Sequence, residues 1–141
     1  EKGQTPWTPA VGVMFSLKEG LTLMLTEGVE STYRRHAHIG DLTRRGVQAL
    51  GLELFADEPY APNTVTAIKM PEDIKWSALS NLLREEYQLV LAGGQGMLSG
   101  KLFRIGHLGW VSESDINHAL AAIEKALASL RNDITLAPES P

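Results

Sequence analysis

One arginine lies in a segment that otherwise reads as an apolar strand. Arg104 is flanked by Leu102, Phe103 and Ile105 in the run 101–106. An unpaired charge is costly to bury, so a guanidinium in this setting needs a partner. Its planar fork fits a carboxylate with two parallel hydrogen bonds. The residues alone leave two interpretations equal: a ligand carboxylate, or a structural salt bridge to an Asp or Glu.

The glycine-rich run 93–100 resembles a phosphate-binding loop but fits neither common pattern. A P-loop needs a glycine where Gln95 stands and a hydroxyl where Leu102 stands. The dinucleotide pattern fails at Ser99, which occupies the place of its third glycine. The segment therefore predicts a turn between two strands.

The remaining polar clusters do not predict a site. His36 and His38 are two positions apart on an expected helix and point to different faces, so they do not form a local ligand pair. With no cysteine in the chain, we expect no metal site. The arginine pairs 34–35 and 44–45 suggest either an anion site or a solvated face. The acidic residues interleaved with them favour the solvated face.

Composition narrows the class of protein. The 141 residues carry a net charge of -4, which argues against a nucleic-acid partner. No run approaches the roughly 20 apolar residues of a membrane helix, and we expect a cytoplasmic protein. The chain begins Glu1-Lys2-Gly3-Gln4 without a signal-peptide pattern. We interpret it as a fragment of a longer protein.

The periodicity predicts an α+β domain with a small, mostly antiparallel sheet of about four strands flanked by helices. Thr8 and Pro9 predict the cap and first turn of a helix that ends at Gly28. Ser112 and Asp115 predict a capping box for the last helix. We expect a leader at 1–9, a domain at 10–131 and a tail at 132–141. The expected order ααββαββα comprises helices near 9–27, 29–50, 71–87 and 112–130, and strands at 52–55, 64–69, 88–91 and 101–106.

Read end to end from about 5 to 130, the chain resembles the C-terminal region of class V aminotransferases of the alanine–glyoxylate and serine–pyruvate type. The supporting stretches are 5–11, 15–17, 48–52 and 64–66, and the most specific is 93–96 followed by 100–109. Within the family it resembles most closely the cyanobacterial members named as a soluble hydrogenase subunit. A chain without cysteine cannot hold nickel or iron in the usual way, so we favour the transaminase interpretation.

The resemblance implies the C-terminal small domain of a homodimeric fold-type I enzyme that uses pyridoxal phosphate (PLP). Arg104 would bind the substrate carboxylate. Thr8 would contact the cofactor phosphate of the opposite subunit, although helix capping would also explain this residue. Thr5 stands where some members carry a tyrosine for the same phosphate.

The catalytic lysine and the acid on the pyridine nitrogen would belong to a larger N-terminal domain. The chain alone would then be inactive and would carry no bound cofactor. The substrates implied are alanine or serine and a 2-oxo acid such as glyoxylate or pyruvate.

Two other functions stay open: a free-standing amino-acid-binding regulatory module, and a non-catalytic subunit associated with a soluble hydrogenase. A large α/β domain encoded just before Glu1 would favour the aminotransferase. The expected first helix is apolar nearly all round, which predicts an exposed apolar surface and self-association.

Overall fold

The computed structural model describes residues 7–136, which form two compact units, one up to Arg35 and one from His36 onward. Helix α2 runs through the boundary between them, and each unit is described by itself. The elements in chain order are α1 (Val11–Glu27), α2 (Val29–Ala49), the short 3-10 helix η1 (Glu58–Tyr60), β1 (Val65–Lys69), α3 (Trp76–Tyr87), β2 (Ala92–Gly93), the 3-10 helix η2 (Gly96–Leu98), β3 (Leu102–Gly106) and α4 (Glu113–Leu136).

Helix α1 buries none of its residues. It ends at Gly28, as predicted, because a φ of 89° suits glycine and the Gly28 N–H caps the Met24 carbonyl. Glu27 then joins the end of α1 to the start of α2. Its carboxylate accepts hydrogen bonds from Arg35 Nε and Nη2, at 2.6 and 2.9 Å, and from the Thr32 hydroxyl.

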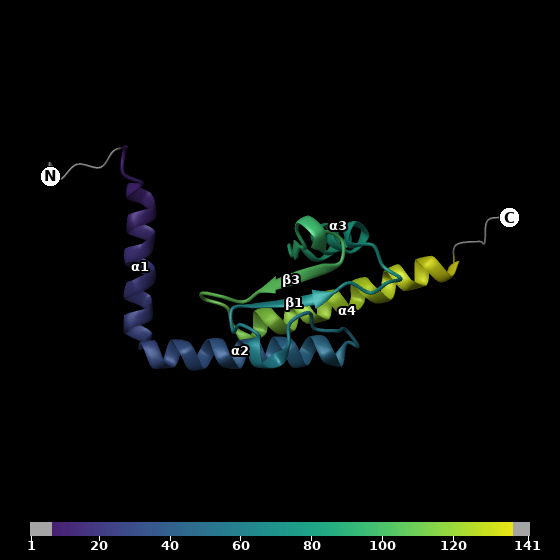
Figure 1. The fold of residues 1–141 in the computed structure, drawn as a ribbon, viewed down its shortest axis with the longest axis horizontal. Helices are drawn as coiled ribbons and strands as arrows, with labels where there is room; N and C mark the ends of the chain where they lie inside the picture. Colours follow the sequence, from purple (N-terminus) through teal and green to yellow (C-terminus); the bar gives the residue numbers. More distant parts are fainter. Residues whose placement is uncertain (1–6, 137–141) are drawn as a thin grey trace. The chain divides into compact units, whose positions relative to one another are not determined.

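The second unit is built on an antiparallel sheet of three strands in the order β1-β3-β2. Ile68 of β1 lies opposite Phe103 of β3, and both are fully buried. Figure 1 shows β1 and β3 lying beside α4, which supplies Ile123 to the same core. Leu79 on α3 also enters this core. The prediction of an α+β domain with an antiparallel sheet is confirmed.

The expected fourth strand does not form. Residues 52–55 make a single bridge, Leu54 to Ile68, and two flanking backbone hydrogen bonds to β1. The strand expected at 88–91 lies instead at Ala92–Gly93, because Gln88 ends α3 in the left-handed conformation with a φ of 53°.

Two helix boundaries also differ from those expected. Helix α3 begins at Trp76 and not directly after Pro71, since Lys75 is still extended. Helix α4 continues to Leu136, so the first residues of the expected tail are helical. Its predicted capping box is present: the Asp115 carboxylate accepts from the Ser112 N–H at 2.9 Å, and the Asp115 N–H donates to the Ser112 hydroxyl.

Two glycines inside α2 mark close contacts. A Cβ added at Gly46 would lie 2.2 Å from Leu120 Cδ1 of α4, and one at Gly40 would lie 3.2 Å from the backbone of Asn63. These glycines therefore keep α2 near α4 and near the loop that precedes β1. In residues 7–136, no helix is both long and apolar enough to cross a membrane.

Candidate functional site

Arg104 lies on β3, the central strand of the sheet, between the buried residues Phe103 and Ile105. Its Nη2 donates a hydrogen bond of 3.1 Å to the carbonyl oxygen of Gly93. Its Nε is buried without a hydrogen-bond partner. None of the ion pairs among the described residues involves Arg104. The structural salt bridge considered for this arginine is therefore not formed within residues 7–136.

A pocket of about 70 Å³ adjoins the guanidinium and has room for several water-sized groups. Its wall comes from β1, β3, α2 and the loop before β1, and it contains two arginines and no acidic residue. The lining residues are Arg44, Leu54, Ala56, Ala61, Pro62, Val65, Thr66, Ala67 and Arg104. Arg104 thus meets an apolar wall in which a bound anion would encounter no competing carboxylate.

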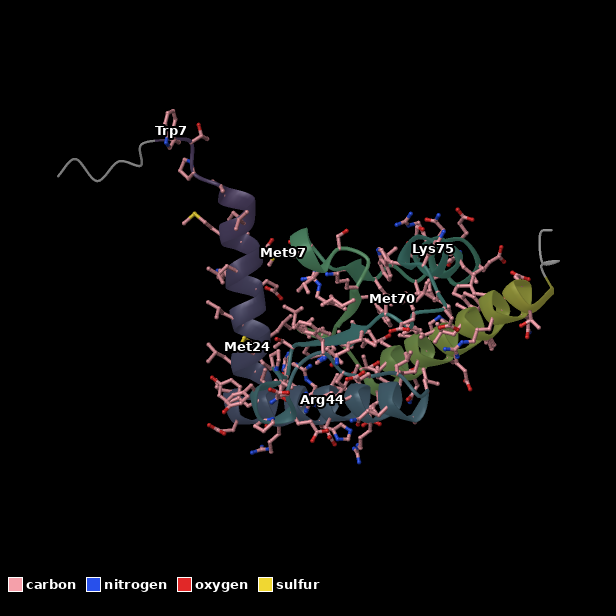
Figure 2. The ribbon with its side chains drawn as sticks, turned by 45° about the vertical axis from the view of Figure 1, so that its right-hand side comes forward. Trp7, Met24, Arg44, Met70, Lys75 and Met97 are labelled. Carbon is pink, nitrogen blue, oxygen red and sulfur yellow. The ribbon has the colours of Figure 1, made fainter. Side chains whose placement is uncertain are left out.

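Arg44 also lines the pocket, whereas the sequence favoured a solvated face over an anion site for the pair 44–45. It extends from α2 (Figure 2) and donates long hydrogen bonds of 3.4 Å to the Pro62 carbonyl and the Asn63 side chain. Its neighbour Arg45 pairs with Asp41 on the surface at 2.7 Å, which confirms the solvated face for that residue. Besides the arginine pair itself, a local signal for Arg44 is its place one turn after Gly40, which faces the same loop.

The glycine-rich run is a turn between β2 and β3, as predicted. A Cβ at Gly93 would lie 2.5 Å from Trp76 Nε1, and one at Gly94 would lie 2.0 Å from the Leu98 carbonyl oxygen. Trp76 in turn stacks on Phe103, with ring centroids 5.8 Å apart. These glycines permit tight packing of the turn and of α3 against the sheet, which explains them without a phosphate ligand.

Three of the four histidines have separate structural partners. His107 is buried, with its Nε2 hydrogen-bonded to the Thr66 hydroxyl at 2.9 Å. Burial lowers the pKa of His107, against a smaller opposing effect of the Asn63 backbone. His36 accepts from the Gly109 N–H at 3.1 Å, and His38 contacts Glu113 at 2.9 Å. Within the described ranges no three potential ligands gather as a metal site would require.

Of the two threonines expected near the cofactor phosphate, the structure describes Thr8 alone. Thr8 is exposed and precedes α1, whose N-cap is Ala10 and lacks a side-chain hydrogen bond. Helix capping by Thr8, the competing explanation, is therefore wrong, and so is Pro9 as the first helical residue. Thr5 lies outside the described residues. Contact of either threonine with a phosphate stays a prediction.

The lysines of the described residues all lie at the surface. Each of them is exposed, and Lys69 is paired with Glu53. A Schiff-base lysine is typically desolvated, which lowers its pKa and makes it nucleophilic. None of the described lysines is buried as such a residue would be.

Comparison with known proteins identifies related sequences and the fold. No family model matches the chain. It is 45% identical over 130 residues to an uncharacterized aminotransferase of Methanocaldococcus jannaschii, covering 92% of this chain and 34% of that protein. Pyridoxamine–pyruvate aminotransferase of Mesorhizobium loti has the same fold, with a TM-score of 0.86, 34% identity and coverage of 92% of this chain and 34% of that one.

The fold and the sequence thus both match a segment of known aminotransferases. More particularly, the chain corresponds to the C-terminal region of the class V aminotransferases. The cyanobacterial resemblance is also confirmed: the soluble hydrogenase 42 kDa subunit of Anabaena cylindrica is 39% identical over 132 residues, with 94% of this chain and 34% of that protein covered. The chain spans about a third of the length of these relatives.

Proposed function

We propose that this chain is the small domain of a PLP-dependent transaminase that moves an amino group between alanine or serine and a 2-oxo acid such as glyoxylate or pyruvate. Its contribution is to bind the substrate carboxylate through Arg104. The observation that carries the proposal is the placement of Arg104 beside an apolar pocket, with one nitrogen held by Gly93 and no ion pair among the described residues.

The chemistry of the reaction explains why an arginine serves here. The amino donor and the oxo-acid acceptor share a carboxylate, so one fixed guanidinium binds both in turn. The Gly93 carbonyl occupies only one of its nitrogens. Apolar walls lower the local dielectric constant and strengthen the pairing with a carboxylate.

The reactive centre lies outside this chain in our proposal. PLP supplies an electron sink for the carbanion formed during amino transfer. Its lysine and its acid come from a larger N-terminal domain, which packs with this region in a cytoplasmic homodimer. Thr8 contributes to binding the phosphate in the opposite subunit, and Thr5 stands where some members carry a tyrosine for the same contact.

The test is Arg104→Lys in the complete protein, with a steady-state analysis of both substrates. Lysine keeps the charge but loses the two-pronged geometry. KM should rise for donor and acceptor alike, by about 1.5–3 kcal/mol in binding free energy. Cofactor absorbance and melting temperature should barely change. Unchanged KM values, or a variant that unfolds, would refute the assignment.

A free-standing amino-acid-binding module is the second candidate, because the same pocket and arginine could retain an amino acid without catalysis. The two functions differ in a simple measurement. Expression of the complete gene product should yield a protein that converts pyruvate and serine when PLP is added. A product of this chain's length that binds amino acids and has no transaminase activity would favour the module. A non-catalytic subunit associated with a soluble hydrogenase is the third candidate, on the similarity to the relatives named as such subunits; the lack of cysteine argues against nickel or iron held by this chain itself.

A further inference from the structure

The loop between β3 and α4, residues 107–112, is held at its start, its middle and its end. At its start His107 is buried, and near its end Val111 packs against the hydrophobic core. Between them the Gly109 N–H donates a hydrogen bond of 3.1 Å to the Nε2 of His36 on α2. This bond therefore joins the middle of the loop to a residue 73 positions earlier in the chain.

The chemistry of this bond requires a neutral His36. A backbone N–H can only donate, so the Nε2 that accepts from it must carry a lone pair. An imidazolium has a proton on both ring nitrogens and accepts no hydrogen bond. Proton uptake by His36 therefore breaks the bond to Gly109 and sets two donors against each other.

The charges around His36 add to this effect. The titratable and charged groups on the surrounding elements include His107 at the end of β3, Glu113 at the start of α4, and Arg35, His38 and Arg44 on α2. Arg35 is paired with Glu27, and its charge is thereby compensated. Glu113 contacts the ring of His38 at 2.9 Å. Arg44 and His36 both lower the pKa of the buried His107, because positive charges in this region repel one another.

We propose that the His36–Gly109 hydrogen bond is a pH-sensitive contact that orders residues 108–110. The neutral imidazole holds this segment against α2, and proton uptake releases it while both ends of the loop stay anchored. The released segment carries two exposed apolar side chains, those of Leu108 and Trp110. The inference concerns the order of this loop and does not depend on the proposed function.

The test is an NMR titration of this chain between about pH 8 and about pH 5. The ring signal of His36 reports its own protonation, and the Gly109 N–H signal reports the hydrogen bond. The two should change with one midpoint, and the protection of this N–H from solvent exchange, corrected for the intrinsic rate, should fall about fivefold or more. Relaxation of the ¹⁵N nuclei should show faster motion of residues 108–110 at the acid end and no change for Ile105 in β3. A Gly109 signal that follows the ring of His107 instead, or that does not change with pH, would overturn the inference.

Three variants on α2 separate this contact from its surroundings. The side-chain carbonyl of His36→Gln can accept from the Gly109 N–H but does not titrate, so the pH step of the Gly109 signal should disappear. His36→Ala removes the acceptor, so residues 108–110 should be mobile at neutral pH as well. His38→Gln is the matched control, since it removes the imidazole that contacts Glu113 and should keep the step. A step that persists in His36→Gln, or a loop as well ordered in His36→Ala as in the wild type, would refute the proposal.

Discussion

The Nη2 atom of Arg104 donates to the carbonyl oxygen of Gly93, and the other side of Gly93 packs against the indole of Trp76. Trp76 also stacks on Phe103, the residue that precedes Arg104 in β3. The orientation of the guanidinium therefore depends on how closely β2 and α3 fit together. A glycine is required at position 93 because the space for a side chain is filled by Trp76.

We predict that Gly93→Ala destabilises the fold and displaces Arg104. The new Cβ would lie 2.5 Å from Trp76 Nε1, and relief of such overpacking costs about 1–3 kcal/mol. Urea unfolding measures the loss, and the Arg104 Nε–Hε signal reports the displacement. Gly106→Ala is the matched control, since its Cβ would meet only Leu108 at 3.9 Å. Equal stability of the two variants would contradict the prediction.

Much of the fold followed from local patterns. Gly28 and the Ser112–Asp115 box fix helix ends through short-range backbone geometry, and both were predicted. The alternation of β-branched residues in β1 marked a strand for the same reason. Residues 52–55 were predicted as a strand on composition. Only Leu54 forms a bridge, because pairing depends on a neighbour that the local sequence does not specify.

The site was predicted in part. Arg104 stood out because a charge in an apolar strand is anomalous whatever the tertiary fold. Arg44 did not, because its neighbours read as a solvated helix face. Its place in the pocket depends on the loop at Pro62 and Asn63, which is 18 and 19 residues away in the chain. Long-range contacts of this kind are not encoded in the periodicity of either segment.

Gly46→Ala should fail to stabilise α2 although alanine is the better helix former. The propensity gain is about 1 kcal/mol, but the Cβ would lie 2.2 Å from Leu120 Cδ1. Thermal unfolding should show no gain or a loss. A Cβ at Gly20 of α1 would have nothing within 4 Å, so Gly20→Ala should stabilise α1 by the full propensity difference of about 1 kcal/mol. Leu120→Ala removes the side chain that the new Cβ would meet, so in that background Gly46→Ala should cost less stability than in the wild type. If the losses of the two single variants simply add in the double variant, the steric explanation is wrong.

The chain should self-associate through α1. None of its residues is buried, and the exposed apolar side chains include Phe15, Leu17 and Leu25. A contiguous apolar surface of this kind is typical of an interaction site. Phe15→Lys should reduce the association measured by sedimentation velocity, whereas Ser16→Lys, on the adjacent polar position, should have a smaller effect. A monodisperse monomer at high concentration would contradict the prediction.

Acid should destabilise the second unit through His107. Burial lowers the pKa of this imidazole from 6.5, with Arg44 and His36 contributing in the same direction. In the unfolded chain His107 regains its ordinary pKa, so below that value the unfolded state binds more protons than the folded state. The stability linked to this histidine is thus fully present above about pH 6.5 and is lost as pH falls toward its folded pKa. One proton taken up on unfolding corresponds to at most about 1.4 kcal/mol per pH unit.

The measurement is urea unfolding of the wild type and of His107→Gln between about pH 7.5 and about pH 5.5. Glutamine can keep a hydrogen bond to Thr66 but does not titrate, so its curve should be flatter with pH even if the variant is less stable throughout. His38→Gln serves as the comparison because that imidazole is exposed beside Glu113. The His38→Gln variant should retain the acid sensitivity that His107→Gln loses, because the His38 side chain is exposed in the folded state. Parallel curves for wild type and His107→Gln would show that the acid sensitivity arises elsewhere.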